Sequence, residues 1–203
     1  IHGGVLYWPQ KKSGLNVISL VPVTPYQGIL ISNNLADSIS KRNEITEQLI
    51  KYLQNNFDYI DFILAPEIQD IRPYQWQKFE IETKYTYRFK LTDPETLIQQ
   101  FNSNLKRKVK KFSESGLQAQ YLSDTQPLLD FIISSYERNN LKPPVGKTEL
   151  KRVFQQLLKN ELAKIVYIKD GENIVAGKIV TFDQNYVYSF FVGMTDEFRS
   201  SYN

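Results

Sequence analysis

The sequence contains no cysteine and only one histidine among its 203 residues. The absence of cysteine excludes disulfides, thiolate metal sites and a cysteine nucleophile within this chain, and it favours a reducing compartment, so we predict a cytoplasmic location. The histidine, His2, stands beside the start of the sequence and is expected to be a loop residue without a role. A Ser-His-Asp triad or a zinc site with several histidines is hard to build from such a chain, and we predict no metal.

The sequence also lacks long hydrophobic runs. The longest, such as residues 17–23 and 60–65, are far shorter than the roughly 20 residues that a membrane helix needs, so no membrane span is expected. The start, Ile1-His2-Gly3-Gly4, has no initiator methionine, no charged segment and no hydrophobic segment after it. We therefore expect the sequence to be internal to a longer polypeptide.

Composition otherwise indicates a globular protein. Hydrophobic residues make up 41% and charged residues 23%, while aromatic residues are abundant at 13%. A net charge of +3 is too small to indicate nucleic-acid binding by itself. The length fits one large domain or two small ones.

The first 91 residues are expected to alternate between strands and helices. Ser40 is expected to cap a helix that ends near Asn56, with Ile45, Leu49, Tyr52 and Leu53 on its apolar stripe. The other elements predicted here are strands at 5–8, 15–21 and 23–31 with a turn at 9–14, a buried strand at 59–64, a short turn or helical piece at 70–76, and a strand at 84–91.

A domain boundary is predicted near residue 92. Thr92-Asp93-Pro94-Glu95 combines capping-box spacing with an early proline, and the helix that it opens is expected to run to Gly116. The predicted elements that follow are a strand at 117–122, helices at 126–139 and 148–160, and strands at 163–169, 174–182 and 186–192. The sequence therefore predicts a mixed α/β protein of the α+β type, with domains at 1–91 and 92–203.

Cofactor motifs are absent or incomplete. Val145-Gly146-Lys147-Thr148 ends like a phosphate-binding loop, but the earlier glycine would fall at Leu141, and Pro143 and Pro144 remove backbone donors. No dinucleotide fingerprint and no acidic calcium loop occurs in the sequence. We predict no nucleotide loop and no covalently bound cofactor.

Basic residues crowd the end of the helix that follows residue 92. Lys106, Arg107, Lys110 and Lys111 form a basic ridge, with Lys108 at its flank, opposite the apolar residues Leu105, Val109 and Phe112. One interpretation is a solvated face that complements the negative end of the helix dipole. The other is a docking surface for phosphate groups, to which Lys and Arg donate charge-assisted hydrogen bonds.

The last predicted strand is rich in aromatic residues. Tyr186, Tyr188, Phe190 and Val192 are expected on one face, Val187, Ser189 and Phe191 on the other, and Gly193 follows. Core packing explains such a pattern, and so does a tyrosine or serine that faces a substrate, with a glycine that lets a ligand approach the backbone. Residues 199–203 then supply cap-type residues where a new helix, and an anion site at its start, are expected.

The chain resembles the FemAB-like family, whose members pair two lobes of the GNAT acyltransferase fold. The resemblance rests on Pro22–Gly28, on Asp70–Trp76 with Tyr85-Thr86-Tyr87 behind it, on Phe101–Lys111, on Asn173–Gly177 and on Tyr188–Gly193. It implies tandem GNAT-like lobes, each with a mixed, mainly antiparallel sheet flanked by helices. Residues 1–91 would form a partial first lobe, and residues 92–203 a second lobe truncated after its fourth strand.

The resemblance also implies an activity. Such proteins pass an acyl or aminoacyl group from acyl-CoA or aminoacyl-tRNA to an acceptor amine on a small molecule, peptide or glycan, such as a cell-wall precursor. Backbone donors polarise the carbonyl, and no covalent nucleophile is needed. Nucleic acid is a partner only if tRNA is the donor. The glycine-rich pyrophosphate loop of many GNAT lobes is not matched by residues 193–203.

Site residues follow from this resemblance. Tyr188 and Ser189 are predicted as catalytic residues near the reacting centre. The other assignments are Phe190, Gly193, Arg199 and Ser200 for the donor, Lys106, Arg107 and Lys110 for an anion, and Arg72, Tyr74 and Trp76 for the lobe junction. The alternative is a non-catalytic GNAT-like module that holds a phosphorylated or acidic partner through the basic ridge. Nucleic-acid binding is less well supported, because aromatic residues do not interleave with the ridge.

Overall fold

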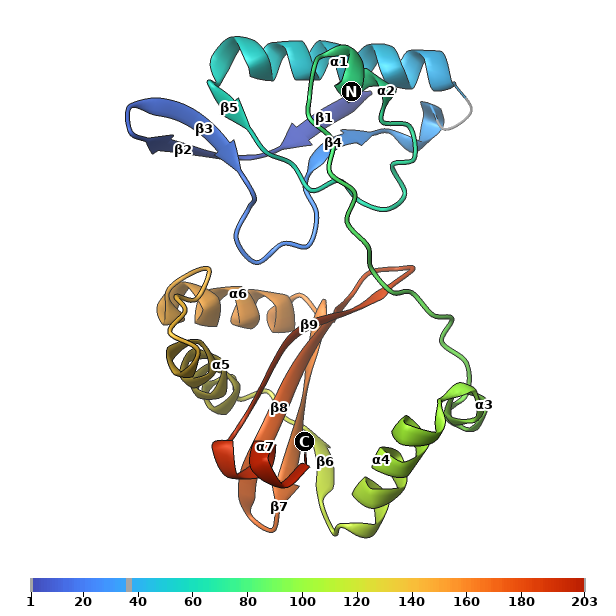
Figure 1. The fold of residues 1–203 in the computed structure, drawn as a ribbon, viewed down its shortest axis with the longest axis vertical. Helices are drawn as coiled ribbons and strands as arrows, with labels where there is room; N and C mark the ends of the chain where they lie inside the picture. The colour runs from blue at the N-terminus through green and yellow to red at the C-terminus, as the bar shows by residue number, and fades with distance from the viewer. Residues whose placement is uncertain (1, 36–37, 203) are drawn as a thin grey trace. The chain divides into compact units, whose positions relative to one another are not determined.

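The computed structural model describes residues 2–35 and 38–202 (Figure 1). Its contacts divide the chain into unit 1, Ile1–Tyr87, and unit 2, Arg88–Asn203. Each unit has its own sheets, and each is described by itself. None of the helices in these described ranges has both the length and the apolar character needed to cross a membrane.

Unit 1 packs one long helix, α1 (Ile39–Asn56), against two small sheets. In the first sheet, β1 (Gly3–Leu6) pairs antiparallel with β4 (Gly28–Ile31). In the second, β3 (Leu15–Ser19) pairs antiparallel with β2 (Trp8–Lys12) and parallel with β5 (Tyr59–Ile60). The 3-10 helix η1 (Asn33–Leu35) and the short helix α2 (Arg72–Trp76) complete the unit. Ile29, Ile50 and Tyr74 form the buried cluster of the core.

The first hairpin turns more tightly than predicted. Lys12 pairs with Leu15, so only Ser13 and Gly14 connect β2 to β3, and both have positive φ angles of 51° and 84°. Two positive φ angles are the signature of the two-residue hairpin turn whose twist matches that of the strands. The predicted turn at 9–14 was therefore too long. Pro9 is tolerated because β2 is an edge strand.

The predicted strand at 23–31 is confirmed only for its last part, β4. In the segment before β4, the Gln27 side chain makes hydrogen bonds that a neighbouring strand would otherwise make. Its Oε1 accepts from the Val21 N–H at 2.5 Å, and its Nε2 donates to the Asp61 carbonyl at 2.8 Å. The predicted strand at 59–64 is likewise limited to β5. The Gln27 side chain and the backbone hydrogen bond from the Gln27 N–H to the Ile63 carbonyl, at 2.8 Å, therefore connect this part of unit 1.

Helix α1 ends where predicted but differs in its start and in its buried face. It begins at Ile39 after Ser38, so Ser40 lies inside the first turn, and its buried residues are Thr46, Ile50 and Leu53. Tyr52 is exposed, so the predicted stripe was wrong at that position. The helical period alone admits two neighbouring stripes, and packing against the sheets and α2 selects one of them.

The predicted strand at 84–91 was wrong. Residues 77–93 contain no helix or strand, and the side chains of Tyr85 and Tyr87 are 91% and 98% exposed. The segment alternates apolar and polar residues as a strand does, but no described strand pairs with it. An alternating pattern becomes a strand only when a ladder satisfies its backbone groups.

Unit 2 contains a four-stranded antiparallel sheet in the order β6-β7-β8-β9. Its elements in chain order are α3 (Pro94–Gln100), α4 (Ser103–Glu114), β6 (Gln118–Tyr121), α5 (Gln126–Arg138), α6 (Lys147–Lys159), β7 (Ala163–Asp170), β8 (Asn173–Phe182), β9 (Val187–Met194) and α7 (Asp196–Tyr202). The predicted order of strand, two helices and three strands is confirmed. The mixed α/β class is confirmed too, because antiparallel-rich sheets are flanked by helices in both units.

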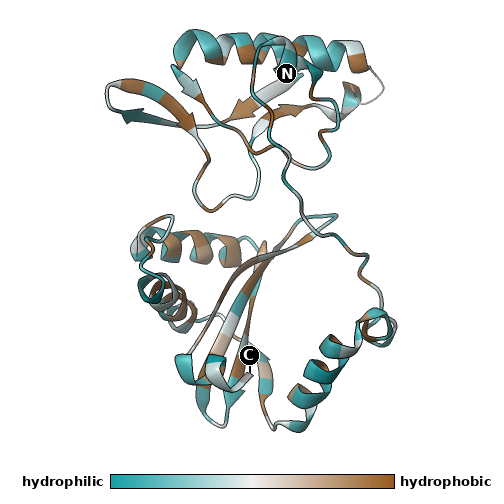
Figure 2. Cartoon of the chain, viewed as in Figure 1, coloured by the Kyte–Doolittle hydropathy of each residue, from teal (hydrophilic) through white to brown (hydrophobic). Residues whose placement is uncertain are grey.

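Helices α5 and α6 lie together on one side of this sheet, whereas α3 and α4 stand on the other side (Figure 1). The core on the α5 and α6 side is mainly apolar and includes Leu128, Ile132, Leu150, Phe154, Ile165, Tyr167 and Ile179. By contrast, α4 has no buried residue and is hydrophilic over most of its length (Figure 2). Only one face of the sheet therefore carries a closed core.

The single helix predicted from 92 to 116 is two helices. Asp93 caps α3 by accepting a hydrogen bond from the Thr96 N–H at 2.9 Å, and Pro94 follows at the first helical position. Asn102 caps α4 in the same way, because its Oδ1 accepts from the Leu105 N–H at 2.9 Å. A side chain that caps a helix competes with continuation of the helix before it. The chain therefore breaks at Phe101 and Asn102.

Candidate functional site on strand β9 and helix α4

Strand β9 contains a β-bulge at Phe190. Ile179 of β8 pairs with Phe191, and the next residue, Val180, pairs with Ser189, so Phe190 is an extra residue without a partner. Residues that pair across strands share a face of the sheet. Tyr188 and Phe191 therefore lie on the face that α5 and α6 cover, and Ser189 lies on the other. The predicted strict alternation along this strand was wrong, because it has no place for an inserted residue.

The bulge turns two neighbouring aromatic rings toward helix α6. The ring centroids of Phe190 and Phe191 are 4.8 Å apart, and they lie 6.4 and 5.7 Å from that of the buried Phe154. Phe190 was assigned to donor binding. Its observed contacts are with the aromatic residues of the core, and its contact with a donor stays a prediction.

The two predicted catalytic residues differ in surroundings. The Tyr188 hydroxyl donates to Oδ2 of Asp183 at 3.1 Å, whereas Ser189 is exposed. The Asp183 carboxylate also accepts from the N–H groups of Asn185 and Tyr186, at 2.7 and 2.8 Å, and these bonds hold its pKa below the ordinary value. A hydroxyl bonded to an ionised carboxylate is an arrangement that can relay a proton.

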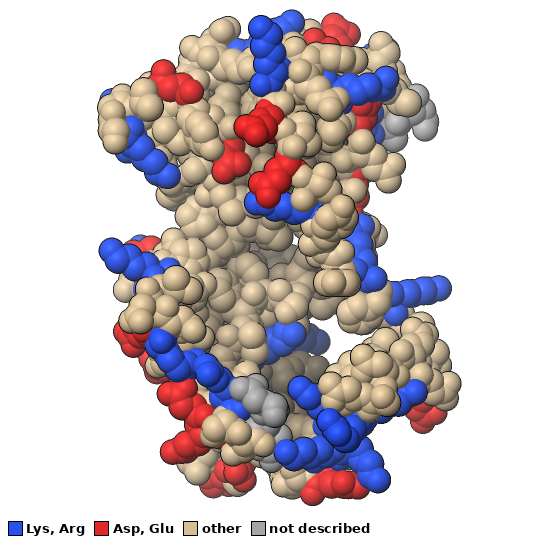
Figure 3. Space-filling model, viewed as in Figure 1, with Lys and Arg blue, Asp and Glu red and all other residues tan. Residues whose placement is uncertain are grey.

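The basic ridge is exposed along α4, where Figure 3 shows Lys and Arg side chains gathered in the lower right of the view. The Lys106 ammonium donates to the Gln99 carbonyl at 2.8 Å, and that of Lys110 lies 3.7 Å from the Glu114 carboxylate. Arg107 donates to the Asn104 side chain at 3.1 Å, and with Ser103 these two residues line a shallow hollow of about 390 Å³. Leu105, on the opposite side of α4, is 41% exposed.

Helix α7 begins earlier than predicted. The Thr195 hydroxyl accepts from the Phe198 N–H at 3.2 Å, and the helix starts at Asp196 rather than near Ser200. Arg199 and Ser200 lie inside the helix, where the Ser200 hydroxyl donates to the Glu197 carbonyl at 2.8 Å. The first turn carries two carboxylates, Asp196 and Glu197, which oppose a phosphate there.

One contact brings α4 and α7 together. The Lys111 ammonium, at the end of the basic ridge, donates to the Ser201 carbonyl at 3.3 Å. The residues assigned to anion binding and those assigned to the donor on α7 therefore come from neighbouring elements. Sequence spacing alone could not indicate this, because 90 residues separate the two groups.

Gly193 is buried where α5 crosses β9. A Cβ atom at this position would lie 2.5 Å from Cβ of Phe131 and 3.1 Å from the backbone nitrogen of Ile132. The close approach of α5 accounts for the glycine without a ligand. Its assignment to the donor site stays a prediction.

The three residues assigned to a lobe junction belong to unit 1. Arg72 donates two hydrogen bonds to the Asp70 carboxylate, at 2.8 and 2.7 Å, which lower the pKa of Asp70 and raise that of Arg72. The Arg72 guanidinium also lies over the Trp76 ring at 5.9 Å. Tyr74 is buried in the core of the unit. The junction itself stays a prediction.

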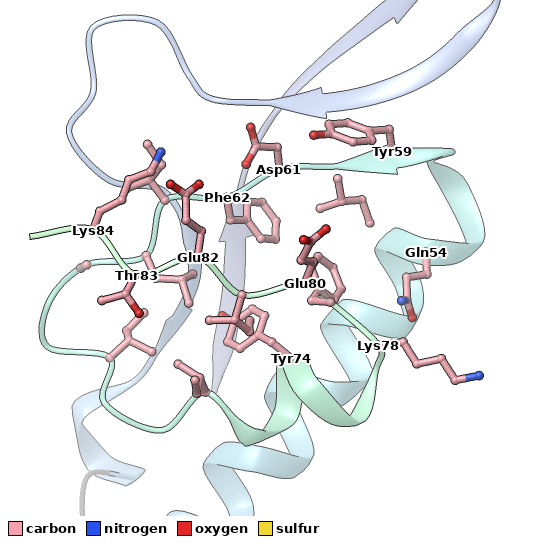
Figure 4. A pocket seen from close by; sticks show the side chains of 18 of the residues that line it. Gln54, Tyr59, Asp61, Phe62, Tyr74, Lys78, Glu80, Glu82, Thr83 and Lys84 are labelled. Atoms are coloured by element: carbon pink, nitrogen blue, oxygen red, sulfur yellow. The ribbon is translucent and has the colours of Figure 1, made fainter.

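Unit 1 also contains a cavity that sequence reasoning missed. It has a volume of about 1040 Å³ and is lined by residues between Gln54 and Lys84 (Figure 4). The only sequence signal was the alternation of apolar and acidic residues in Phe79-Glu80-Ile81-Glu82. In the described ranges, the cavity included, no group of three or more His, Asp or Glu residues is placed to hold a metal ion.

A comparison with protein families matches residues 99–202, just over half of the chain, to a family described as "Acetyltransferase (GNAT) domain". The matched stretch runs from the end of α3 to α7, so it contains the whole four-stranded sheet, the bulged strand and the basic ridge. A search of curated proteins finds no match to the chain.

Proposed function

Because the chain belongs to the GNAT acetyltransferase family, we propose that it transfers an acyl group from acyl-CoA to an acceptor amine. The observation that carries the proposal is the bulge at Phe190 in β9, the last strand of the sheet in the described part of the chain. A bulge interrupts the ladder, and an edge strand has backbone N–H groups on its open side. Together these features leave backbone N–H groups of β9 available as hydrogen-bond donors, whereas a regular inner strand uses its N–H groups in the ladder.

In this proposal the reaction proceeds by positioning. Backbone N–H groups of β9 beside the bulge bind the thioester oxygen as negative charge develops on it. The amine nitrogen forms the new bond to the carbonyl carbon, and the bond between carbon and sulfur breaks. The nitrogen loses a proton and the leaving thiolate gains one. Tyr188, bonded to Asp183, and Ser189 are the side chains proposed to handle that transfer.

The donor's phosphate groups are proposed to bind the basic ridge, principally Lys106, Arg107 and Lys110. The exposed Lys and Arg side chains supply charge-assisted donors, and the contact between Lys111 and Ser201 supports placing Arg199 and Ser200 at the same donor. Phe190 and Gly193 are also proposed to contact the donor. The carboxylates at the start of α7 argue against a pyrophosphate at that helix end.

The finer assignment is to the FemAB-like type. Its support is the order of motifs along the sequence, from Pro22–Gly28 to Tyr188–Gly193. In this proposal residues 1–91 are a partial first GNAT-like lobe and residues 92–203 a second. Aminoacyl-tRNA is then an alternative donor, and the acceptor amine belongs to a peptide, a glycan or a cell-wall precursor.

The test is titration of the full chain with acetyl-CoA, followed by measurement of acetyl transfer to a panel of amines. We expect saturable binding that weakens as salt increases. Replacing Lys106, Arg107 and Lys110 together by alanine is expected to weaken acetyl-CoA binding about tenfold. The matched control replaces the exposed Lys151, Arg152 and Lys159 of α6, which removes the same charge and leaves affinity unchanged.

Two outcomes separate the proposal from its alternative. A chain that binds neither acetyl-CoA nor aminoacyl-tRNA is not a transferase of this kind. The exposure of the basic ridge favours, as the second candidate, a module that holds an acidic partner without catalysis. That module would bind a phosphorylated peptide in a salt-sensitive way, and its affinity would survive Tyr188→Phe and Ser189→Ala.

A further inference from the structure

The cavity of unit 1 is a half-open hollow with the volume of a small-molecule site. Two segments face each other across it: residues 58–66, which include β5, and residues 78–84, which follow α2 (Figure 4). Its volume of about 1040 Å³ is at the upper end of ordinary ligand pockets. It lies outside the residues matched by the acetyltransferase family, and none of the residues proposed above for donor binding or proton transfer lines it.

The cavity has a mixed lining, with apolar side chains on both walls. Phe62 and Leu64 line one side, and Phe79 and Ile81 line the other. Phe62, Leu64 and Phe79 pack against the buried core of unit 1 yet remain only half-buried, and Ile81 is exposed. A ligand with an apolar body would remove this apolar surface from water, which favours binding.

Tyr74 supplies a hydroxyl to the same cavity. The residue is 3% exposed and lines the cavity, and its hydroxyl makes no hydrogen bond with any residue that the structure describes. Burial raises its pKa to about 12, so the phenol is neutral at physiological pH. The hydroxyl oxygen is not among the fully buried side-chain atoms that lack a partner, so it is reached from the cavity. The cavity is the side from which a ligand can provide a partner.

The charges around the cavity are mainly negative. Glu80 and Glu82 extend from their segment toward the opposite wall, and Asp61 lies on that wall, whereas Lys78 points away (Figure 4). Within the described ranges, none of these three carboxylates has a hydrogen bond or an ion pair. Lys84 is the other cation of the lining. The Asp58 carboxylate accepts a hydrogen bond from the Asn16 N–H at 2.8 Å. The balance favours a positively charged ligand.

We propose that this cavity binds an amphipathic organic cation. The ammonium group of the ligand donates hydrogen bonds to the carboxylates of Glu80 and Glu82 and to the Tyr74 hydroxyl. The apolar body of the ligand covers Phe62 and Phe79. Neither the carboxylates nor the hydroxyl alone defines the ligand, but their combination with apolar side chains on both walls of the cavity does.

The test uses n-hexylammonium chloride as the probe and the full chain at pH 7, with calorimetric titration. Hexanoate and 1-hexanol, which share the apolar chain, are the ligand controls. We expect hexylammonium to bind saturably, 1-hexanol to bind more weakly and hexanoate not to bind. Binding of hexanoate as tight as that of hexylammonium would overturn the proposal, and so would the absence of any hexylammonium binding.

Two variants locate the site. Glu80→Gln with Glu82→Gln is expected to weaken hexylammonium binding on the order of fivefold, whereas Glu44→Gln, on the exposed face of α1, leaves it unchanged. Tyr74→Phe is expected to weaken it roughly threefold. Unchanged affinity in the double glutamine variant would contradict the assignment even if the Tyr74 variant failed to fold.

Discussion

Gly193 sets the distance between helix α5 and strand β9. Gly193→Ala places a methyl group 2.5 Å from Cβ of Phe131, so α5 must move away from the sheet. We expect the free energy of unfolding to fall by about 1–3 kcal/mol, as for other overpacked cores. Chemical denaturation measures this, and Gly4→Ala is the control, because a Cβ at Gly4 meets nothing within 4 Å. If Gly193→Ala weakened acetyl-CoA binding without loss of stability, the donor role would gain support instead.

Tyr167 caps helix α5 from another part of the chain. The residue is fully buried, and its hydroxyl accepts from the Leu128 N–H at 3.3 Å and donates to the Asp124 carbonyl at 2.5 Å. Tyr167→Phe leaves both backbone groups without that partner. The expected cost is about 1–3 kcal/mol of unfolding free energy. Tyr121→Phe on the exposed face of β6 is the control and should change stability little.

Among the elements, α4 is held in place by its cap more than by burial. None of its residues is buried, so the hydrogen bond from the Leu105 N–H to Asn102 is a large part of what defines its start. Asn102→Ala is expected to cost the helix about 1 kcal/mol. Amide exchange in the first turn of α4 should accelerate accordingly, while Asn102→Asp, which keeps the accepting oxygen, should retain protection. Equal exchange in both variants would contradict this account.

For the molecule as a whole, the two units meet in sequence at an unusually exposed segment. Tyr85, Tyr87 and Phe89 are 91%, 98% and 70% exposed, and the segment has no helix or strand. Limited digestion with chymotrypsin is therefore expected to cut first within 85–89, which mass spectrometry of the fragments would show. Replacing the three aromatic residues by serine should remove that first cut. Early cleavage inside the four-stranded sheet would contradict the division into two units.

Alkaline pH provides a second whole-molecule prediction. Burial raises the pKa of both Tyr74 and Tyr167 to about 12, whereas an unfolded tyrosine ionises near pH 10. Between these values the unfolded chain loses protons that the folded chain keeps, so stability is full below about pH 10 and is lost as pH rises toward about 12. Urea unfolding at several pH values checks this. The loss should be smaller for Tyr74→Phe with Tyr167→Phe, and unchanged for Tyr85→Phe with Tyr87→Phe.

The sequence by itself determined the elements whose signals are local. The positions of α5, α6, β6, β7 and β8 follow from apolar periodicity and turn residues close to each element, and the predicted order matches the structure. The resemblance to GNAT acyltransferases also came from the sequence, since it depends on that order. Local signals of this kind do not require knowledge of the neighbouring element.

Only the tertiary structure decided the features that depend on a partner. The bulge at Phe190 reverses the faces of a strand, and it arises from the pairing of β9 with β8. The closeness of Lys111 to α7, the role of Gly193 under α5 and the lack of strand structure at 84–91 likewise depend on residues distant in sequence. Side-chain periodicity fixes what a segment can bury, and packing decides which face is buried and against what.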